Sequence, residues 1–383
     1  MPCRRGNVLR TFRSRQSPFV SRNIYVLALE SSADDTCAAV VSSNRKILSN
    51  VVAHQFQDQE KWGGIHPMIS TECHQKRMPG TVRMALEESG MDMDSIDGIA
   101  FTRGPGMVSC LNVGANAAKT LAAALNKPIV GVHHMQAHAL TPFLTSENPP
   151  QFPFLALLAS GGHTMLLLAT SPVSFKMLAN TADVSIGNAF DRVSRELKIP
   201  WGEASGSARI GAGPMLEKIA AKHPTSNPYS FPELPLAMQG SLGFSFGGLV
   251  SSVQRLITKL GPAATEDSAT QAAIAHAFQH AAVGQLQEKL MLALRSCERR
   301  GIAVKTVVAS GGVASNMYLR SCVESTMKTL GIAVQYPPIS LCTDNAAMIA
   351  WASMDRFLRG DVDPYDITVK PKWDLGELHA PPE

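Results

Sequence analysis

The stretch FPFLALLASGGHTMLLLAT, residues 152–170, decides the fold class. An apolar run leads into a Ser-Gly-Gly-His turn and a second apolar run follows, which is the pattern of a β-hairpin. The same plan occurs earlier in IYVLALESSADDTCAAVVSS, residues 24–43. A third strand with a glycine turn, followed by a helix, is predicted in VKTVVASGGVASNMYLRSCV, residues 304–323. A hairpin that occurs once in each half of the chain predicts two similar lobes.

Stretches with helical spacing of apolar residues lie between these strands, at residues 78–90, 111–127 and 269–301. Strands that alternate with helices indicate an α/β protein. We predict the two-lobed actin-like ATPase fold of the actin, hexokinase and Hsp70 group, with a central nucleotide cleft. The N-terminal lobe would span residues 24–140 and be completed by a C-terminal helix within about 345–383, and the C-terminal lobe would span 141–344. Residues 199–245, rich in glycine, proline and serine, are expected to form long loops near a site.

The composition is that of an ordinary globular protein. The chain has 383 residues, with 45% hydrophobic and 17% charged residues, a length that suits two lobes. Its apolar runs are too short or too charged to predict a membrane span. Seven cysteines form no CxxC pair, which argues against a disulfide framework and a cysteine-built zinc site.

The basic charge is concentrated at the N-terminus. MPCRRGNVLRTFRSRQSPFVSR, residues 1–22, carries six arginines, and no acidic residue precedes Glu30. Without those six, 29 basic residues oppose 31 acidic ones, so the body of the chain has a net charge of about −2. An arginine- and serine-rich leader without acids predicts a mitochondrial transit peptide, which we assign to residues 1–23. The protein is then expected in the mitochondrial matrix; the alternative is a basic tail without that role.

Three histidines occur within six positions in GVHHMQAHAL, residues 131–140. On a helix, His134 and His138 share one face, which makes a two-ligand metal site that needs a third ligand from elsewhere. Solvated or packed histidines are the alternative. A second pair of the same spacing, His276 and His280, lies mid-helix and far from any glycine turn, and we interpret it as surface or packing histidines.

Three glycine turns each follow a predicted strand, at residues 102–107, 159–164 and 309–316. Backbone N–H groups in such turns can converge on an anion. Each could be a plain tight turn, but the three together favour a site for nucleotide phosphate. A P-loop is excluded because Ala118 stands where that motif requires glycine.

Several carboxylates accompany these turns. Glu30, Asp34 and Asp35 lie in the first hairpin turn, where they could bind a metal, accept a proton, or only make turn hydrogen bonds. Asp344 precedes an apolar helix and could simply cap it. Asp191 could simply pair with an arginine of its own helix.

Nine short motifs follow one another along residues 24–375: LALESSADDT, GGIHPMISTECH, TRGPGM, VHHMQAH, LLASGGHT, NAFDRVSREL, LGFSFGGL, SGGVASN and CTDNAAMIA. In this order they resemble the tRNA N6-adenosine threonylcarbamoyltransferase family, formerly called the O-sialoglycoprotein endopeptidase or glycoprotease family. The leader and the sequence DDT indicate its mitochondrial branch.

The resemblance implies a reaction and a set of site residues. The family transfers a threonylcarbamoyl group from threonylcarbamoyl-AMP to N6 of adenosine 37 in tRNAs that read ANN codons, and releases AMP. One divalent metal ion, iron or zinc with magnesium as the alternative, would bind His134, His138 and Asp344. Glu30, Asp34 and Asp35 would be the catalytic carboxylates, with Asp34 as our candidate for accepting the N6 proton. The implied substrate contacts are Leu158, Ala159, Ser160, Gly161, Gly162, Asp191, Gly213, Glu217, Ser315, Asn316 and Thr343.

The resemblance also implies partners: the anticodon loop of a mitochondrial tRNA, a second copy of the chain in a homodimer, and no membrane. Bacterial members have Glu where this chain has Asp35, and the loop at about 202–210 is an insertion. A sugar kinase of the same fold is disfavoured by the histidine pair, a metallopeptidase by the absence of HExxH, and a non-enzymatic scaffold by the intact ligand set. We assign no specific tRNA contact; the candidates are residues 74–77, Arg83, Arg192, Arg195 and Lys198.

Overall fold

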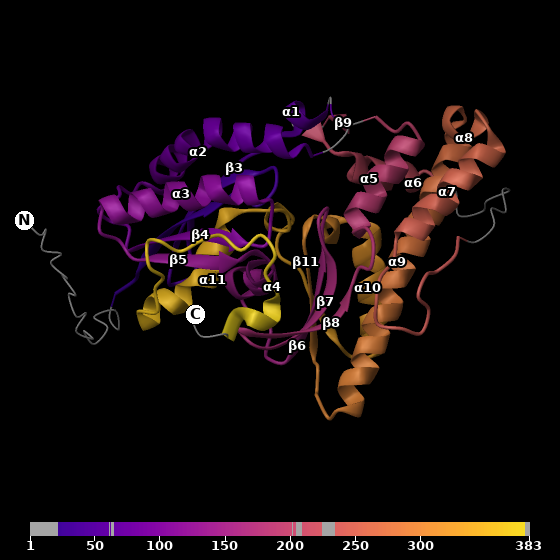
Figure 1. Cartoon of the computed structure of the whole chain (residues 1–383). Helices are drawn as coiled ribbons and strands as arrows, with labels where there is room; N and C mark the ends of the chain where they lie inside the picture. The colour runs from indigo at the N-terminus through magenta and orange to yellow at the C-terminus, as the bar shows by residue number, and fades with distance from the viewer. Residues whose placement is uncertain are drawn as a thin grey trace, which may run out of the picture.

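The computed structural model describes residues 22–60, 62, 65–200, 202–203, 209–223 and 234–379. Nearly all of the predicted transit peptide, and most of the inserted loop at 202–210, lie outside these residues. Two five-stranded mixed sheets stand side by side, and helices surround them (Figure 1). Among the described residues, no helix combines the length and the apolar character that crossing a bilayer requires.

The two sheets follow one plan. In each, three antiparallel strands come first in the chain, and two further strands then add in parallel beside the first of them. The first sheet has the order β3-β2-β1-β4-β5 and the second has the order β12-β11-β6-β7-β8. The strands of the first sheet are β1 (Tyr25–Glu30), β2 (Thr36–Ser42), β3 (Ile47–Ala53), β4 (Gly98–Gly104) and β5 (Ile129–His133). Those of the second are β6 (Phe154–Ala159), β7 (Thr164–Ser171), β8 (Ser174–Asn180), β11 (Thr306–Ser310) and β12 (Ala333–Gln335).

Eleven helices occur in the described residues. The first part of the chain forms α1 (Phe56–Glu60), α2 (Pro67–Ser89), α3 (Val108–Ala124) and α4 (His134–Thr145). The second forms α5 (Ile186–Glu196), α6 (Ala212–Ala220), α7 (Gly247–Leu260), α8 (Ala263–Glu266), α9 (Ser268–Arg299), α10 (Met317–Thr329) and α11 (Ala346–Arg359). Short strands β9 (Gly202–Glu203) and β10 (Arg209–Ile210) pair with each other, and 3-10 turns occur at Gly312–Ser315, Ile339–Leu341 and Leu375–His379.

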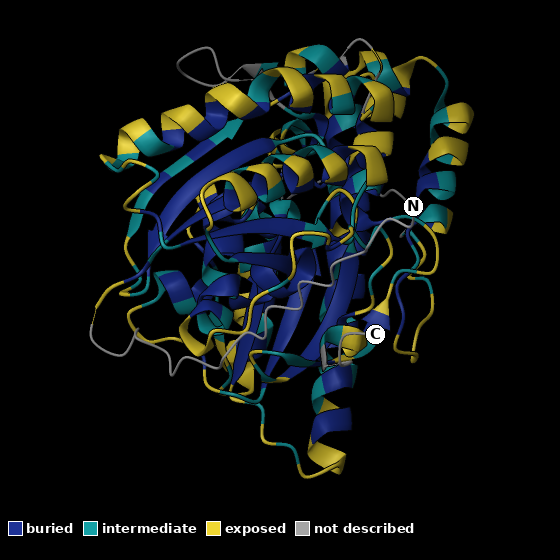
Figure 2. Cartoon of the chain, turned by 60° about the vertical axis from the view of Figure 1, so that its left-hand side comes forward, coloured by how far each residue is buried: buried dark blue, intermediate teal, exposed yellow. Residues whose placement is uncertain are grey.

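Both faces of each sheet are buried. Side chains alternate along a strand, so each strand contributes residues to both layers. In β1, Leu27 and Leu29 face a cluster with α2 and α3, whereas Val26 and Ala28 face a cluster with α4 and α11. In the second sheet, one face packs on α5, α7, α9 and α10, and the other on α4. Figure 2 shows the result: dark strands in the interior and exposed residues on the outer faces of the helices.

Helix α4 lies between the two sheets. Ala137 and Leu144 belong to the core of the first sheet, and Met135, Ala139 and Leu140 to that of the second. All but two of its residues are buried, so a polar side chain on this helix is held in a fixed position at the centre of the molecule. The predicted lobe boundary at residue 140 falls inside α4, and the division of the chain into domains stays a prediction.

Two local expectations need correction, and one alternative is excluded. Helix α2 ends before Gly90 as predicted but begins at Pro67, well before residue 78. The stretch 199–245 is not all loop: α6 forms inside it, because Leu216 and Ala220 recur at helical spacing and are buried. Asp344 does not cap α11; Asn345 does so, by accepting the backbone N–H of Met348 at 2.9 Å.

Candidate active site

The structure brings the three predicted metal ligands together. His134 and His138 stand one turn apart at the start of α4, with ring centroids 4.8 Å apart. Asp344, from the segment just before α11, places Oδ1 3.1 Å from His138 Nε2 and 3.4 Å from His134 Nε2. One ligand atom from each of the three lies within 4.8 Å of the others. The second histidine pair is not part of this group. His280 Nδ1 forms a hydrogen bond with the hydroxyl of Tyr318 at 2.9 Å.

The donor set fits a transition metal. Metal–nitrogen and metal–oxygen bonds of about 2.0–2.2 Å place neighbouring ligand atoms roughly 3 Å apart, which is close to the spacing of the Asp344 oxygen from both imidazoles. Two imidazoles and a carboxylate suit iron or zinc better than magnesium, which prefers oxygen ligands. Three protein ligands leave coordination positions for a substrate phosphate or water.

Glu30 orients His134. It is fully buried, and Oε2 accepts the Nδ1–H of His134 at 3.0 Å and the hydroxyl of Thr102. Oε1 accepts the backbone N–H of Ser32 at 2.5 Å. Because Nδ1 is engaged in this way, Nε2 of His134 points toward Asp344. A carboxylate that accepts the N–H of a histidine orients the ring in the same way in many metal sites. Glu30 was predicted to be a catalytic carboxylate; in the structure it contacts the predicted ligand His134, and its catalytic role stays a prediction.

The charges at this point favour a cation. Burial by itself would lower the pKa of His134, but the carboxylates of Glu30 and Asp344 outweigh that effect and raise it to about 10. Burial lowers the pKa of His138. The imidazole of His134 opposes the effect of burial on Asp344 and holds its pKa well below the ordinary value. The same field that holds a proton on His134 would hold a metal ion in its place.

The acidic turn between β1 and β2 is adjacent to this group. Burial, with Asp35 and then Asp344 nearby, raises the pKa of Asp34 to about 7. Asp35 accepts the Nδ1–H of His54 at 2.8 Å, and this contact raises the pKa of His54. His54 was missed by sequence analysis, because only the fold brings the end of β3 beside the turn.

The second and third glycine turns lie next to each other. Strands β6 and β11 are parallel neighbours, with Leu158 opposite Ser310, so both turns leave the same edge of the sheet. Gly311 has φ +98°, and a Cβ there would clash with the carbonyl oxygen of Ala159. Leu158 and Ala159 are themselves buried at the end of β6. Ser160, Gly161 and Gly162 form the accessible part of this predicted contact, and a Cβ on either glycine would meet no atom within 4 Å.

The other predicted substrate contacts surround these turns. Asp191 on α5 accepts the backbone N–H of Gly213, and burial raises its pKa to about 6, against the lowering effect of Arg195. On α6, Glu217 accepts the backbone N–H of Met317 at 2.7 Å, at the start of α10.

The start of α10 is held by its own polar residues. Asn316 caps the helix through Leu319 N–H and donates to Gln279, a buried partner that sequence analysis missed. Ser315 donates to the carbonyl of Gly312, and Thr343 lies against the same glycine. These contacts join Asp191 to Gly213, Glu217 to the start of α10, and Ser315 and Thr343 to the third glycine turn, while the roles of these residues stay predictions.

His163 is a further residue that sequence analysis did not select. It follows the second glycine turn, and its ring centroid lies 6.5 Å from that of His134. Burial, with the charge of His134, lowers its pKa to about 4, so the ring is neutral at physiological pH. The sequence shows His163 within the motif SGGHT, but only the geometry of the β6–β7 hairpin shows that its ring lies near His134.

Comparison with known proteins identifies the family. The family model TsaD, described as tRNA N6-adenosine threonylcarbamoyltransferase, matches residues 46–351. A curated relative of that name from Rickettsia canadensis (strain McKiel) is 36% identical over 355 residues, which cover 92% of this chain and 99% of the relative. The metal dependence of the family is consistent with the triad of His134, His138 and Asp344.

Solved structures show the fold. HypF of T. kodakarensis has a TM-score of 0.56 at 14% identity, covering 90% of this chain and 50% of that one. Component A of the (R)-2-hydroxyglutaryl-CoA dehydratase of Acidaminococcus fermentans has a TM-score of 0.51 at 14% identity, covering 87% and 98%. These neighbours confirm the predicted actin-like ATPase fold. The chain belongs to the TsaD family of tRNA N6-adenosine threonylcarbamoyltransferases.

Proposed function

We propose that this transferase moves the threonylcarbamoyl group of threonylcarbamoyl-AMP to N6 of adenosine 37 in mitochondrial tRNAs that read ANN codons, and releases AMP. Family membership supports the transfer to tRNA. The arginine-rich leader, residues 1–23, supports the mitochondrial matrix as its location. The observation that carries the proposal is the group formed by His134, His138 and Asp344 beside two glycine turns.

The reaction needs little more than these groups. The lone pair of adenine N6 forms the new N–C bond with the carbamoyl carbon, and the C–O bond to phosphate breaks, its electron pair leaving with AMP. A divalent ion bound by the triad would supply positive charge for that phosphate. Backbone N–H groups of Gly161 and Gly162 would donate to the same anion, while that of Ser160 closes the turn on the carbonyl of His163.

The N6 proton goes to Asp34 in this scheme. A carboxylate with a pKa of about 7 is suited to accept a proton at physiological pH and to release it afterwards. Asp35 is held by His54, which fixes that neighbouring carboxylate in place. Glu30 keeps His134 in position and does not itself touch the reacting atoms.

The test is a direct assay of transfer. Full-length, metal-replete protein is incubated with threonylcarbamoyl-AMP and a transcript of an ANN-decoding mitochondrial tRNA, and the nucleosides are analysed by mass spectrometry. We expect threonylcarbamoyladenosine from the wild type and none from the double variant His134→Ala/His138→Ala. The variant His276→Ala/His280→Ala changes a pair of the same spacing on α9 and should keep the activity. Absence of product from folded, metal-bound wild type would refute the proposal.

Two further parts of the proposal have their own tests. Residues 1–23 fused to a fluorescent protein should direct it to mitochondria, and replacement of the leader arginines by glutamine should leave it in the cytosol. We also propose a homodimer, as the family resemblance implies. Light scattering on the purified protein should then give twice the 41.0 kDa chain mass, less any cleaved leader.

A further inference from the structure

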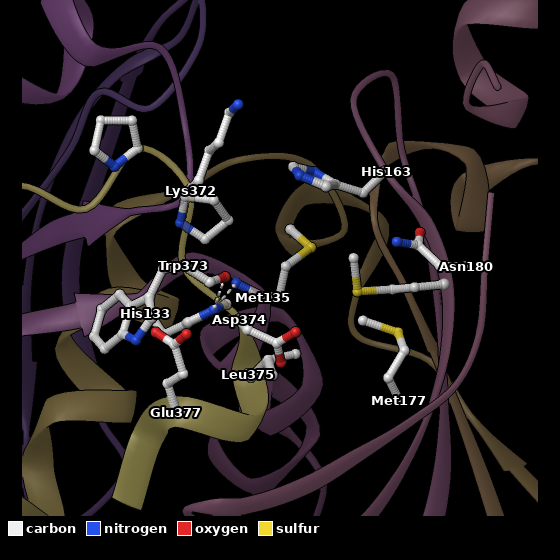
Figure 3. A pocket seen from close by; sticks show the side chains of 13 residues that line it. His133, Met135, His163, Met177, Asn180, Lys372, Trp373, Asp374, Leu375 and Glu377 are labelled. Atoms are coloured by element: carbon white, nitrogen blue, oxygen red, sulfur yellow. Dashed lines mark hydrogen bonds between the residues drawn. The ribbon is translucent and has the colours of Figure 1, made fainter. Parts of the chain in front are cut away.

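A cavity of about 490 Å³ opens between β7 and β8 on one side and the C-terminal segment of the chain on the other (Figure 3). Its size lies within the range of roughly 300–1,000 Å³ that is usual for small-molecule sites. Sequence analysis assigned it no role. Its lining residues are Pro105, His133, Met135, His163, Met165, Met177, Asn180, Pro371, Lys372, Trp373, Asp374, Leu375 and Glu377.

The cavity adjoins the metal centre but not the predicted donor contacts. His163 lines it, and the ring of His163 lies 6.5 Å from that of the ligand His134. Met135, which also lines it, is the next residue after that ligand. None of the eleven predicted substrate contacts is among the lining residues, so the cavity is separate from the predicted adenylate contacts.

The lining suits a flat, polarisable ring. Met135, Met165 and Met177 present three thioethers, which make favourable contacts with aromatic faces. Trp373 adds an aromatic surface, while its Nε1–H is buried and has no hydrogen-bond partner in the described part of the chain. Figure 3 shows the amide of Asn180 turned toward the cavity, while its Oδ1 accepts the N–H of Thr181. The NH2 group of Asn180 is a donor that matches the ring nitrogens of a purine, which are acceptors.

The rim is suited to a polynucleotide. The guanidinium of Arg103 and the ammonium of Lys370 lie 5.3 Å and 5.6 Å from the centroid of the Trp373 ring. Lys372 is the one cationic side chain of the lining, and it extends away from the cavity in Figure 3. Arg103 and Lys370 lie outside the lining, over the ring of Trp373, so the three cations flank this wall of the cavity and do not line its interior. Asp374 and Glu377 belong to the lining, so a neutral base and not a phosphate suits the cavity itself, and the phosphates of a bound strand would meet the cations outside it. Proteins that bind single-stranded nucleic acid commonly combine an aromatic side chain that contacts a base with cations that contact the phosphates.

We propose that this cavity, the acceptor pocket, holds the adenine ring whose N6 is modified, with the base turned out of the anticodon loop. The inference rests on the proposed function and adds the position of the acceptor. Enzymes that act on a base take it out of its stack and hold it between apolar side chains. The C-terminal segment 371–377 forms one wall, so it contacts the RNA substrate directly.

Photocrosslinking tests the position. A synthetic anticodon stem-loop with 2-azidoadenosine at position 37 is irradiated with full-length, metal-replete protein and saturating AMP, which fills the donor site without reacting. Peptide mass spectrometry should find the label on the segments 163–180 and 371–377. Label confined to the donor turns or to any other surface would overturn the proposal.

Kinetics separate the acceptor pocket from the donor site. Trp373→Ala and Asn180→Ala should each raise the KM for tRNA about tenfold, the effect of losing one stacking or hydrogen-bonding contact to a base, and leave the KM for threonylcarbamoyl-AMP unchanged. Trp373→Phe keeps an aromatic face and should restore most of the affinity. Lys259→Ala, an exposed cation on α7 remote from the pocket, is the control for general charge effects.

The outcomes are distinguishable. Melting temperatures identify any variant that fails to fold, and Asn180 is exposed, so its replacement leaves the core intact. A raised KM for the adenylate with an unchanged KM for tRNA would assign the cavity to the donor and refute the inference. If the wild type makes no threonylcarbamoyladenosine, the proposed function itself fails, wherever the crosslink falls.

Discussion

Replacing Glu30 by Gln should lower the affinity of the protein for its metal ion about 10–100-fold, the usual cost of removing a hydrogen-bond partner behind a histidine ligand. Three donors converge on the Glu30 carboxylate: the Nδ1–H of His134 at 3.0 Å, the Thr102 hydroxyl, and the N–H of Ser32 at 2.5 Å. A glutamine has the same shape but only one acceptor oxygen, so its NH2 must face one of these donors. The loss corresponds to about 1.4–2.7 kcal/mol of binding free energy.

The assay is competition with a fluorescent zinc chelator, on full-length wild type and variant at one pH. Glu298→Gln, an exposed change of the same type on α9, should bind zinc as tightly as the wild type. The reasoning is refuted if Glu30→Gln keeps full zinc affinity and yet loses transfer activity. Glu30 would then act on the substrate, as sequence analysis predicted, and not through His134.

Burial and neighbouring carboxylates raise the pKa of Asp34 to about 7, so the proton-accepting carboxylate becomes more populated as the pH rises through 7. Initial transfer rates should therefore rise over that pH range. Asp34→Asn should abolish transfer while keeping adenylate binding. Phe278→Ala removes a fully buried ring from the larger core and should lower the free energy of unfolding by about 3–5 kcal/mol, as measured in urea. Gly161→Ala meets no atom within 4 Å and should leave stability within about 0.5 kcal/mol, yet raise the KM for the adenylate by blocking its phosphate. Gly311→Ala, at φ +98° and against the carbonyl oxygen of Ala159, should instead destabilise the protein by about 1–3 kcal/mol in thermal unfolding.

The parts of the fold that depend on local sequence could be predicted. Apolar runs around the two hairpin turns indicated β1–β2 and β6–β7, and both pairs form in the expected places. The start of α2 was missed because Pro79 and Gly80 interrupt the pattern, although tertiary packing keeps the helix continuous. Helix α6 was missed for a similar reason, since Gly213 and the proline after it suggested a loop.

The candidate site could be predicted only as a set of residues. The spacing of His134 and His138 identified a possible pair, and the family resemblance supplied Asp344 as the third ligand. Contacts behind the ligands were not accessible, because they join strands that are far apart in the chain. Glu30 reaches His134 across 104 positions, and only the neighbouring ends of β1, β4 and β5 make that contact possible.

The packing of α11 has a consequence for biosynthesis. One face of the first sheet, formed by strands that end at residue 133, is covered by a helix that begins at residue 346. During translation, that apolar face remains exposed while the entire second sheet emerges. The early strands are therefore open to aggregation or chaperone binding until the last tenth of the polypeptide arrives. Truncations that remove α11 should accumulate as insoluble or chaperone-bound protein, even though they retain every strand of both sheets.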